Sequence, residues 1–516
     1  MAKSDVRDLL LAPRLDASRV GSLLLPYGLV DIEKADANLQ SAAGNPGERL
    51  LLADALPELL ECIAGSANPD QALTYFERFA AAAASRAQLF TYLKNNKQAL
   101  DILMKSIGGS SYMAEILIRD PHHFYWVTDP QILHRVRRKR DIQRDLVQTL
   151  KRLAKEDKQL GYLRAVKRRE MLLIGMRDLL RIASVEETLV ALSVLAEALI
   201  SAIYGVCATA LRRAHKIPPK AFSEFTVFAM GKLGGGELNF SSDVDLMFLY
   251  ASNSEKAAGI PAQEYFRRLA QKISAGLSSL TGEGYIYRVD LRLRPEGDAG
   301  NLADPLDGYE RYYRTRMGAW ERLALLKAWP VAGNRALGRR FLEMSRQFIF
   351  SPPFDDQALA EVRHMKARLD DKISARGQTD RNVKLGTGGI REIELVVQSI
   401  QAIHGGRLPQ ILERNTLRSL VLLFEESFLS AEEFRILQRA YLFLRDVENK
   451  LQMVDDAQTH SLPQELAELR VCARLLGYSG ATAGETPADP FLREYRQHTA
   501  GVNRIFEKFV GLRPQA

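Results

Sequence analysis

Cysteine, histidine and tryptophan are scarce in this sequence. Its 516 residues include 3 cysteines, 8 histidines and 3 tryptophans. Cys62, Cys207 and Cys472 are far apart and form no Cys-x-x-Cys pair, which argues against a disulfide framework and against a structural zinc site. This cysteine usage is typical of a reducing compartment, so we expect a cytoplasmic protein.

Long hydrophobic runs are also rare. The apolar run at residues 9–12 is too short for a signal peptide, so we expect no export. Residues 189–211 are apolar enough to span a bilayer, but they include Glu197, Ser193 and Ser201. We therefore expect a buried core helix at this position and no membrane partner.

Neither sign of charge dominates the chain. It has 71 lysines and arginines against 63 aspartates and glutamates, a formal net charge of +8. Hydrophobic residues make up 46% and charged residues 26%, which excludes disordered and collagen-like chains. The basic run at residues 135–140 is followed by Asp141 and Asp145, which favours a solvated helix face over a nucleic-acid site.

The hydrophobic pattern changes twice along the chain. Helical spacing covers residues 1–215, short alternating runs appear within residues 216–350, and helical spacing returns over residues 351–516. We therefore expect a mostly α-helical protein with a central α/β domain between two helical regions. The expected strands are 225–230, 244–250 and 285–293; the expected helices include 263–279, 357–376, 390–404, 416–426 and 431–454, with a loop at 479–490.

A Walker A motif is missing, which disfavours a P-loop NTPase. The most informative segment is instead MGKLGGGELNFSSDVDL at residues 230–246. Asp243 and Asp245 are two residues apart and share one face of a strand, and Asp290 lies on a later strand. Three carboxylates in this arrangement predict a site for two divalent metal ions.

The same segment contains groups suited to phosphate. Glycines let the backbone approach a ligand closely and present N–H groups to its oxygens, and lysine and serine side chains add further donors. Glycine-rich turns alone are usually structural, but the neighbouring Asp-x-Asp favours a functional site. The predicted phosphate-binding residues here are Gly231, Lys232, Gly234, Gly235, Ser241 and Ser242.

These motifs resemble those of the nucleotidyltransferase superfamily that includes polymerase β. The longer strings resemble a narrower family, the bifunctional glutamine synthetase adenylyltransferase/adenylyl-removing enzymes. The matching strings are GKLGGGELNFSSDVDL at 231–246, YRVDLRLRP at 287–295, WER at 320–322 with Lys327-Ala328, and KLGTGGIREIE at 384–394. The resemblance spans residues 70–475 and implies a polymerase β-like catalytic domain.

Members of that family carry two similar halves, one attaching AMP to a tyrosine of glutamine synthetase and the other removing it. This chain resembles one half, and its motif subtype is more similar to the N-terminal, adenylyl-removing half. The resemblance thus implies phosphorolysis of the adenylylated tyrosine, in which phosphate attacks and ADP is released. ATP-dependent adenylylation of the same tyrosine is the alternative, because one site can catalyse both directions.

The resemblance also assigns residues. Asp243, Asp245 and Asp290 would hold two Mg²⁺ ions, while Arg292 and Arg294 would contact phosphate or hold the Asp290 carboxylate. Lys327 is expected at the nucleotide, and a structural ion pair between domains is the alternative role for it. The roles of five further motif residues stay open between nucleotide contact and structural ion pairing: Glu321, Lys384, Arg391, Glu392 and Glu394. His404 and His460 are expected to be structural.

The resemblance implies glutamine synthetase, a PII-type nitrogen-signalling protein, phosphate, and ADP or ATP as partners. Two other classes of function compete with an enzyme acting on glutamine synthetase. One is a catalytically silent regulatory module that receives PII, which the presence of all three carboxylates disfavours. The other is a nucleic-acid nucleotidyltransferase, suggested only by the basic run at residues 135–140.

Overall fold

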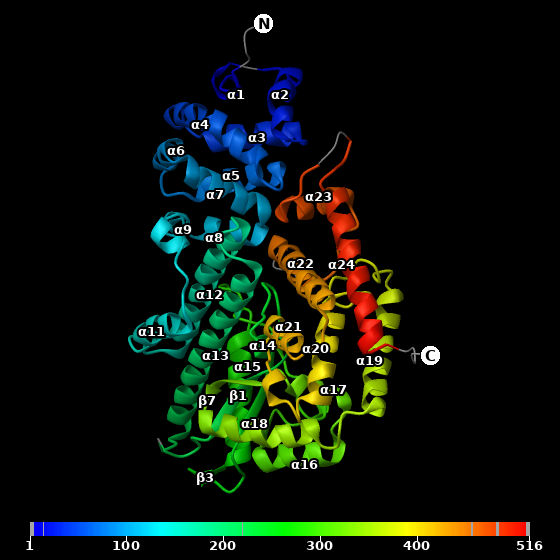
Figure 1. Ribbon diagram of the computed structural model, residues 1–516. Helices are drawn as coiled ribbons and strands as arrows, with labels where there is room; N and C mark the ends of the chain where they lie inside the picture. The colour runs from blue at the N-terminus through cyan, green and yellow to red at the C-terminus, as the bar shows by residue number, and fades with distance from the viewer. Residues whose placement is uncertain (1–4, 14, 219, 456–457, 481–483, 512–516) are drawn as a thin grey trace.

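A computed structural model describes residues 5–13, 15–218, 220–455, 458–480 and 484–511. Helices dominate, and a small mixed sheet lies near one end of the molecule, between two helical regions (Figure 1). The expected fold class is therefore confirmed. The domain limits at residues 215/216 and 350/351 stay predictions.

Short helices stack at the N-terminal end of the molecule (Figure 1). Side-chain caps start many of them; Asn45, for example, accepts hydrogen bonds from the N–H groups of Gly47 and Glu48 at the start of α4. The helices are α1 (Asp8–Leu11), α2 (Ala17–Leu24), α3 (Ile32–Ala43), α4 (Pro46–Ala64), α5 (Pro69–Ala82), α6 (Arg86–Asn95), α7 (Lys97–Gly109), α8 (Ser111–Arg119), α9 (His122–Val127), α10 (Pro130–Leu133) and α11 (Lys139–Leu150), with the 3-10 turn η1 (Leu25–Tyr27).

Two long helices connect this stack to the sheet. They are α12 (Glu156–Leu179) and α13 (Val185–His215), and they pack against each other. Among the described residues, α13 alone is long and apolar enough to cross a membrane, and most of its apolar window is buried inside the protein. It contacts α11, α12, the helix α15 and the strand β7, so the expected core helix at 189–211 is confirmed.

The sheet has the order β5-β2-β1-β7, and β6 also pairs with β2. β1 runs antiparallel to β2 and β7, whereas β5 and β6 run parallel to β2 along its other edge. The strands are β1 (Phe225–Ala229), β2 (Val244–Tyr250), β5 (Val289–Asp290), β6 (Ala303–Pro305) and β7 (Trp329–Gly333), with a separate hairpin of β3 (Lys256–Ala257) and β4 (Ile260–Pro261).

Both faces of the sheet are buried. On β1, Val227 packs toward the core shared with α13 and α15 (Ala262–Ser278), and its neighbour Phe228 packs on the opposite face. There Phe228 meets Tyr309 of α16 (Leu306–Arg316) and Phe341 of α18 (Arg335–Phe350). The alternation expected of strands therefore distributes apolar residues between two cores.

Two local expectations were wrong. The strand predicted at 285–293 is reduced to β5, because the chain turns after Asp290 and the N–H of Arg292 donates back to the Asp290 carboxylate. The expected glycine turn after β1 is a short helix, α14 (Gly231–Gly235), closed by Gly236 in the left-handed conformation.

A C-terminal bundle completes the molecule, and its helices α19 and α24 lie on the side opposite α12 and α13 (Figure 1). The four expected helices there exist within two residues of their predicted ends, but the loop expected at 479–490 ends earlier, because α24 begins at Ala488; residues 481–483 lie outside the described residues. The remaining elements are α17 (Ala319–Leu325), α19 (Asp356–Ser374), α20 (Ile390–His404), α21 (Thr416–Glu425), α22 (Ala431–Asp455), α23 (Leu466–Leu475) and α24 (Ala488–Phe509), with the 3-10 turns η2 (Gly297–Ala299) and η3 (Pro409–Ile411).

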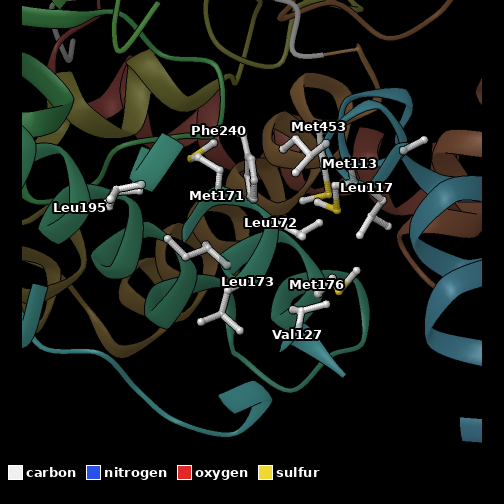
Figure 2. Close-up of a cluster of buried hydrophobic side chains, with 14 of the residues drawn as sticks. Met113, Leu117, Val127, Met171, Leu172, Leu173, Met176, Leu195, Phe240 and Met453 are labelled. Atoms are coloured by element: carbon white, nitrogen blue, oxygen red, sulfur yellow. The ribbon is translucent and has the colours of Figure 1, made fainter. Parts of the chain in front are cut away.

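A methionine-rich cluster joins all three parts of the chain. Figure 2 shows Phe240, from the segment after α14, beside Met171 of α12, and Met453 of α22 beside Met113 of α8. Gly175 on α12 makes room for this packing, because a Cβ there would lie 1.8 Å from Cε of Met113 and 3.3 Å from Cε1 of Phe240. The segment after α14 therefore packs, through Phe240, into a core shared by the N-terminal helices and α22.

Candidate active site

Asp245 and Asp290 are brought together by strand pairing. They are partners in the parallel register of β2 and β5, and both line a cavity of about 540 Å³. That volume falls within the range of small-molecule and cofactor sites. The structure thus places two of the three predicted carboxylates on adjacent strands at one cavity wall.

The carboxylate of Asp245 is held in a confined position. Gly231 has φ +54°, and a Cβ at this glycine would lie 2.5 Å from Oδ2 of Asp245. Burial, with repulsion from Asp290 and Asp243, raises the pKa of Asp245 to about 7. A glycine is needed at 231 because any side chain would fill the space taken by this carboxylate.

Asp290 is held by an arginine. Nη2 of Arg292 donates to Oδ2 of Asp290 at 2.5 Å and Nε lies 3.0 Å from the same oxygen, so this arginine holds the pKa of Asp290 below its usual range. Of the two roles open to Arg292, the structure shows the carboxylate contact. Its side chain is 71% exposed and also lines the cavity.

Asp243 is not one of the residues that line the cavity. It lies directly before β2, and its Oδ1 accepts a hydrogen bond of 2.6 Å from Nε of Arg288. Its Oδ2 accepts a bond of 3.0 Å from Nε2 of Gln458, in the segment after α22. Sequence reasoning missed both partners, because they lie 45 and 215 residues away along the chain.

Lys232 lines the cavity and contacts a buried acid. Its Nζ donates to Oε1 of Glu448 on α22 at 2.7 Å. Burial outweighs this attraction and lowers the pKa of Lys232 to about 7. Nδ1 of His460 lies 2.9 Å from the same oxygen of Glu448. Neither Glu448 nor a link between His460 and the site was predicted, because α22 reads from sequence as an ordinary amphipathic helix.

Lys327 takes part in a second buried network. Its Nζ lies 3.0 Å from Oε2 of Glu237 and 3.3 Å from Oε1 of Glu394 on α20, and it also bonds Oγ1 of Thr416. These carboxylates hold the pKa of Lys327 above its usual range despite burial, and the pKa of Glu394 falls to about 2. Lys327 is thus bound by protein groups at the cavity wall.

Lys384 and Arg391 bring further positive charge to the cavity. Within the described residues, no hydrogen bond or ion pair of the Lys384 side chain is found. Within the same residues, the Arg391 side chain has one contact, 3.4 Å from its Nη1 to Oε2 of Glu394. Lys384 and Arg391 follow α19 in the sequence and line the same cavity as Asp245 and Asp290.

Part of the cavity lining is apolar. Trp320 and Leu323 of α17 and Met365 and Leu369 of α19 form this wall. Trp320 is 40% exposed, so an aromatic face is accessible at the cavity. The cavity therefore offers acidic, basic and apolar surfaces to one ligand.

Several predicted residues do not line this cavity. A Cβ on Gly234 would lie 2.0 Å from the carbonyl oxygen of Lys327, so this glycine permits close backbone packing. Arg294 is buried and donates to the carbonyl groups of its own loop, such as Leu291 at 2.7 Å. The others outside the cavity are Gly235, Ser241, Ser242, Glu321 and Glu392.

Two of these side chains have clear structural partners. Glu321 accepts a hydrogen bond of 2.9 Å from the N–H of Gly318 and thereby caps α17. Glu392 forms an ion pair of 3.1 Å with Lys366 and accepts a bond from Asn503 on α24. Burial raises the pKa of both carboxyl groups.

The donor set fits a hard divalent cation in part. Asp245 and Asp290 offer carboxylate oxygens at the cavity, the ligand type that Mg²⁺ prefers. Within the described residues, however, no three His, Cys, Asp or Glu side chains are grouped closely enough to hold a metal. Asp243 as a third ligand and a second ion stay predictions.

The basic run at residues 135–140 is partly bound within the fold. Arg137 forms ion pairs with Glu170 and Asp145, and Lys139 lies 2.5 Å from Oε2 of Glu197 on α13. These ion pairs neutralise the charges of Arg137 and Lys139 within the run.

Comparison with known proteins points to one family. A model of glutamate-ammonia ligase adenylyltransferase matches residues 100–344, which include β1, β2, α14 and β5. Residues 100–344 are therefore similar to the glutamate-ammonia ligase adenylyltransferase family. This is a nucleotidyltransferase family, and the predicted family resemblance is confirmed. A model of GlnD PII-uridylyltransferase matches residues 363–510.

Similar curated proteins carry one name, bifunctional glutamine synthetase adenylyltransferase/adenylyl-removing enzyme. The protein of Xanthomonas campestris pv. campestris strain B100 is 42% identical over 308 residues, 59% of this chain and 33% of its own length. That of Thioalkalivibrio sulfidiphilus is 37% identical over 414 residues, 79% of this chain and 42% of its own. The match thus spans about a third to two fifths of the relatives' length.

Proposed function

We propose that this chain removes AMP from an adenylylated tyrosine of glutamine synthetase by phosphorolysis. The observation that carries the proposal is the in-register pair Asp245 and Asp290 at a cavity that also holds Lys232, Lys384 and Arg391. Acidic and basic groups that line the same cavity suit the transfer of a phosphoryl-type group between two anionic partners. The glutamine synthetase substrate comes from the names of the similar proteins.

In this reaction an oxygen of inorganic phosphate attacks the phosphorus of the adenylyl-tyrosine. A new P–O–P bond forms, the bond between phosphorus and the tyrosine oxygen breaks, and ADP and the tyrosine are released. Lys232, Lys384 and Arg391 would bind the anionic phosphate oxygens and align the two groups. The apolar wall at Trp320 and Met365 would exclude water, which competes with phosphate as the attacking group.

Asp245 and Asp290, joined by Asp243, would hold magnesium. When bound, Mg²⁺ neutralises charge on the phosphate oxygens and stabilises the departing phenolate, whose conjugate phenol has an ordinary pKa of about 10. The chain's own part is to fix the carboxylates: strand pairing sets the spacing of Asp245 and Asp290, and Arg292 orients Asp290.

Adenylylation from ATP is the second candidate, because the same cavity groups would align the tyrosine oxygen with the α-phosphorus of ATP, from which pyrophosphate leaves. The test is to incubate the protein with adenylylated glutamine synthetase, Mg²⁺ and phosphate, and to measure ADP, beside unmodified synthetase with ATP. ADP release in the first mixture alone is the expected result. AMP incorporation in the second would establish the adenylylating direction, and inactivity in both would overturn the proposal.

A PII-type protein is the proposed regulator. The support is the similarity of residues 363–510 to a PII-uridylyltransferase. Addition of a PII-type protein, in its unmodified and uridylylated forms, should change the rate of ADP release. An unchanged rate with both forms would reject this partner.

A further inference from the structure

Glu448 has an unusual environment for a carboxylate. It lies on α22, its side chain is fully buried, and its partners come from three parts of the chain. Lys232 donates to Oε1 at 2.7 Å, Nδ2 of Asn239 donates to Oε2 at 2.7 Å, and Nη1 of Arg445 lies 3.1 Å from Oε2. His460 lies 2.9 Å from Oε1.

Burying a carboxylate is costly unless several charged or polar groups compensate for the lost water. Here the compensating groups include two residues of the site segment, residues 231–243. They are Lys232 in α14 and Asn239, which comes shortly before Asp243. A second contact supports this segment, because Nη2 of Arg445 donates to the carbonyl oxygen of Glu237. One turn of α22 therefore holds α14 and the chain leading to β2.

The segment after α22 makes a matching set of contacts. Gln458 bonds Asp243, and the carbonyl oxygen of His460 accepts a bond of 2.8 Å from the N–H of Val383. Val383 precedes Lys384, which lines the cavity. Gln458 thus contacts Asp243, and His460 contacts both Glu448 and Val383, the residue before Lys384.

We propose that Glu448 is a positioning residue for the transfer site, which holds the Lys232 ammonium at the cavity wall beside Asp245 and Asp290. The helical region at 363–510 is accordingly a component of the active site, beyond any role in receiving a regulator. The inference rests on the proposed function in that the bound anion is taken to be a nucleotide phosphate.

A purely structural role predicts different behaviour. If Glu448 only stabilises the fold, its replacement lowers stability and leaves the ligand affinity of the folded protein unchanged. Lys450, two residues along α22, provides the matched control, since it is equally buried and pairs with Asp178 of α12 and Asp446 instead of the site segment.

The experiment is a double-mutant cycle on ADP binding, measured by calorimetry with Mg²⁺ present on the full chain. Lys232→Met and Glu448→Gln should each weaken binding about tenfold, as expected for loss of one charge-assisted contact. The double variant should bind as Lys232→Met does, within about twofold, because Glu448 acts through Lys232. Lys450→Met should lower the melting temperature and leave the ADP affinity unchanged.

Glu448→Asp keeps the buried charge while withdrawing the carboxylate from Lys232, so it replaces Glu448→Gln if that variant does not fold. Unchanged ADP affinity in either folded variant, or effects that multiply in the double variant, would overturn the inference. ADP binding by a wild-type protein that is inactive toward glutamine synthetase would reject the proposed function alone. Absence of ADP binding by the wild-type protein would reject both.

Discussion

Asp245 is the most perturbed carboxylate at the site, and its environment predicts an unusual pH dependence. Its pKa is raised from 3.8 to about 7, so between these values the folded state binds more protons than the unfolded state. The free energy of unfolding of the metal-free protein should therefore fall as pH rises from 4 to 7. A shift of this size corresponds to at most about 4 kcal/mol.

Asp245→Asn should remove this slope. Urea unfolding in the presence of a chelator, repeated between pH 4 and 8, should show the variant gaining stability relative to the wild type as pH rises. In the Asp290→Asn variant, the free energy of unfolding should still fall as pH rises, but less steeply than in the wild type. The reason is that repulsion from Asp290 contributes to the raised pKa of Asp245. Parallel curves for the wild type and Asp245→Asn would contradict this electrostatic assignment.

Lys327 and Lys384 line the same cavity but should respond differently to the same substitution. Lys327→Met removes the buried cation that Glu237 and Glu394 share and should cost about 3–5 kcal/mol of folding stability. Lys384→Met breaks no side-chain contact found within the described residues, so it should cost under about 1 kcal/mol.

The two lysine variants separate structure from binding. Lys384→Met should instead weaken ADP binding and raise the KM for phosphate by about tenfold, since the ammonium faces the cavity. Chemical denaturation and steady-state kinetics on both variants provide the comparison. If the Lys327→Met protein is as stable as the wild type but binds phosphate poorly, Lys327 contacts the nucleotide, as the sequence predicts.

At the scale of elements, α14 depends on close backbone contact. Gly234 packs against the carbonyl oxygen of Lys327, where a Cβ would lie 2.0 Å away. Gly234→Ala should therefore displace α14 from the backbone at Lys327, just before β7, and cost at least about 2 kcal/mol. Because α14 carries Lys232, this variant should also lose activity.

Gly236 offers the matched control for α14. It has φ +71°, and a Cβ added at this position would meet nothing within 4 Å, so only the backbone conformation restricts the side chain. Gly236→Asn should cost under about 1 kcal/mol, since asparagine tolerates the left-handed region. Thermal unfolding of both variants tests the contrast, and equal losses would mean that close packing at Gly234 is unimportant.

At the scale of the whole molecule, the C-terminal bundle shares buried charges with the rest of the chain. Lys232 pairs with Glu448, Lys327 with Glu394, and Lys450 with Asp178. A chain ending at residue 355 would leave Lys232 and Asp178 without these partners and would expose the apolar surface that faces the bundle.

Residues 1–355 expressed alone should therefore be insoluble or partly unfolded. Far-ultraviolet circular dichroism and size-exclusion chromatography check this, with the full chain as control. A folded, soluble fragment that binds ADP with the full chain's affinity would show that the bundle is dispensable for the site.

Local pattern accounts for what the sequence predicted well. The periodicity of apolar residues located α20, α21 and α22 within two residues, and the pattern in residues 225–250 located β1 and β2, because these depend on neighbours a few positions apart. The strand predicted at 285–293 was wrong, because the turn after Asp290 is set by a side-chain contact to Arg292 that alternation does not reveal.

The sequence by itself determined the helical class, the central strands and the segment with Lys232, Asp243 and Asp245, since these follow from short-range spacing and residue chemistry. Only the tertiary structure decided which charges meet. Lys232 and Glu448 are 216 residues apart, and Asp243 and Gln458 are 215 apart. Such partners become neighbours only when α22 packs against the segment between β1 and β2, because buried charges are satisfied by proximity in space.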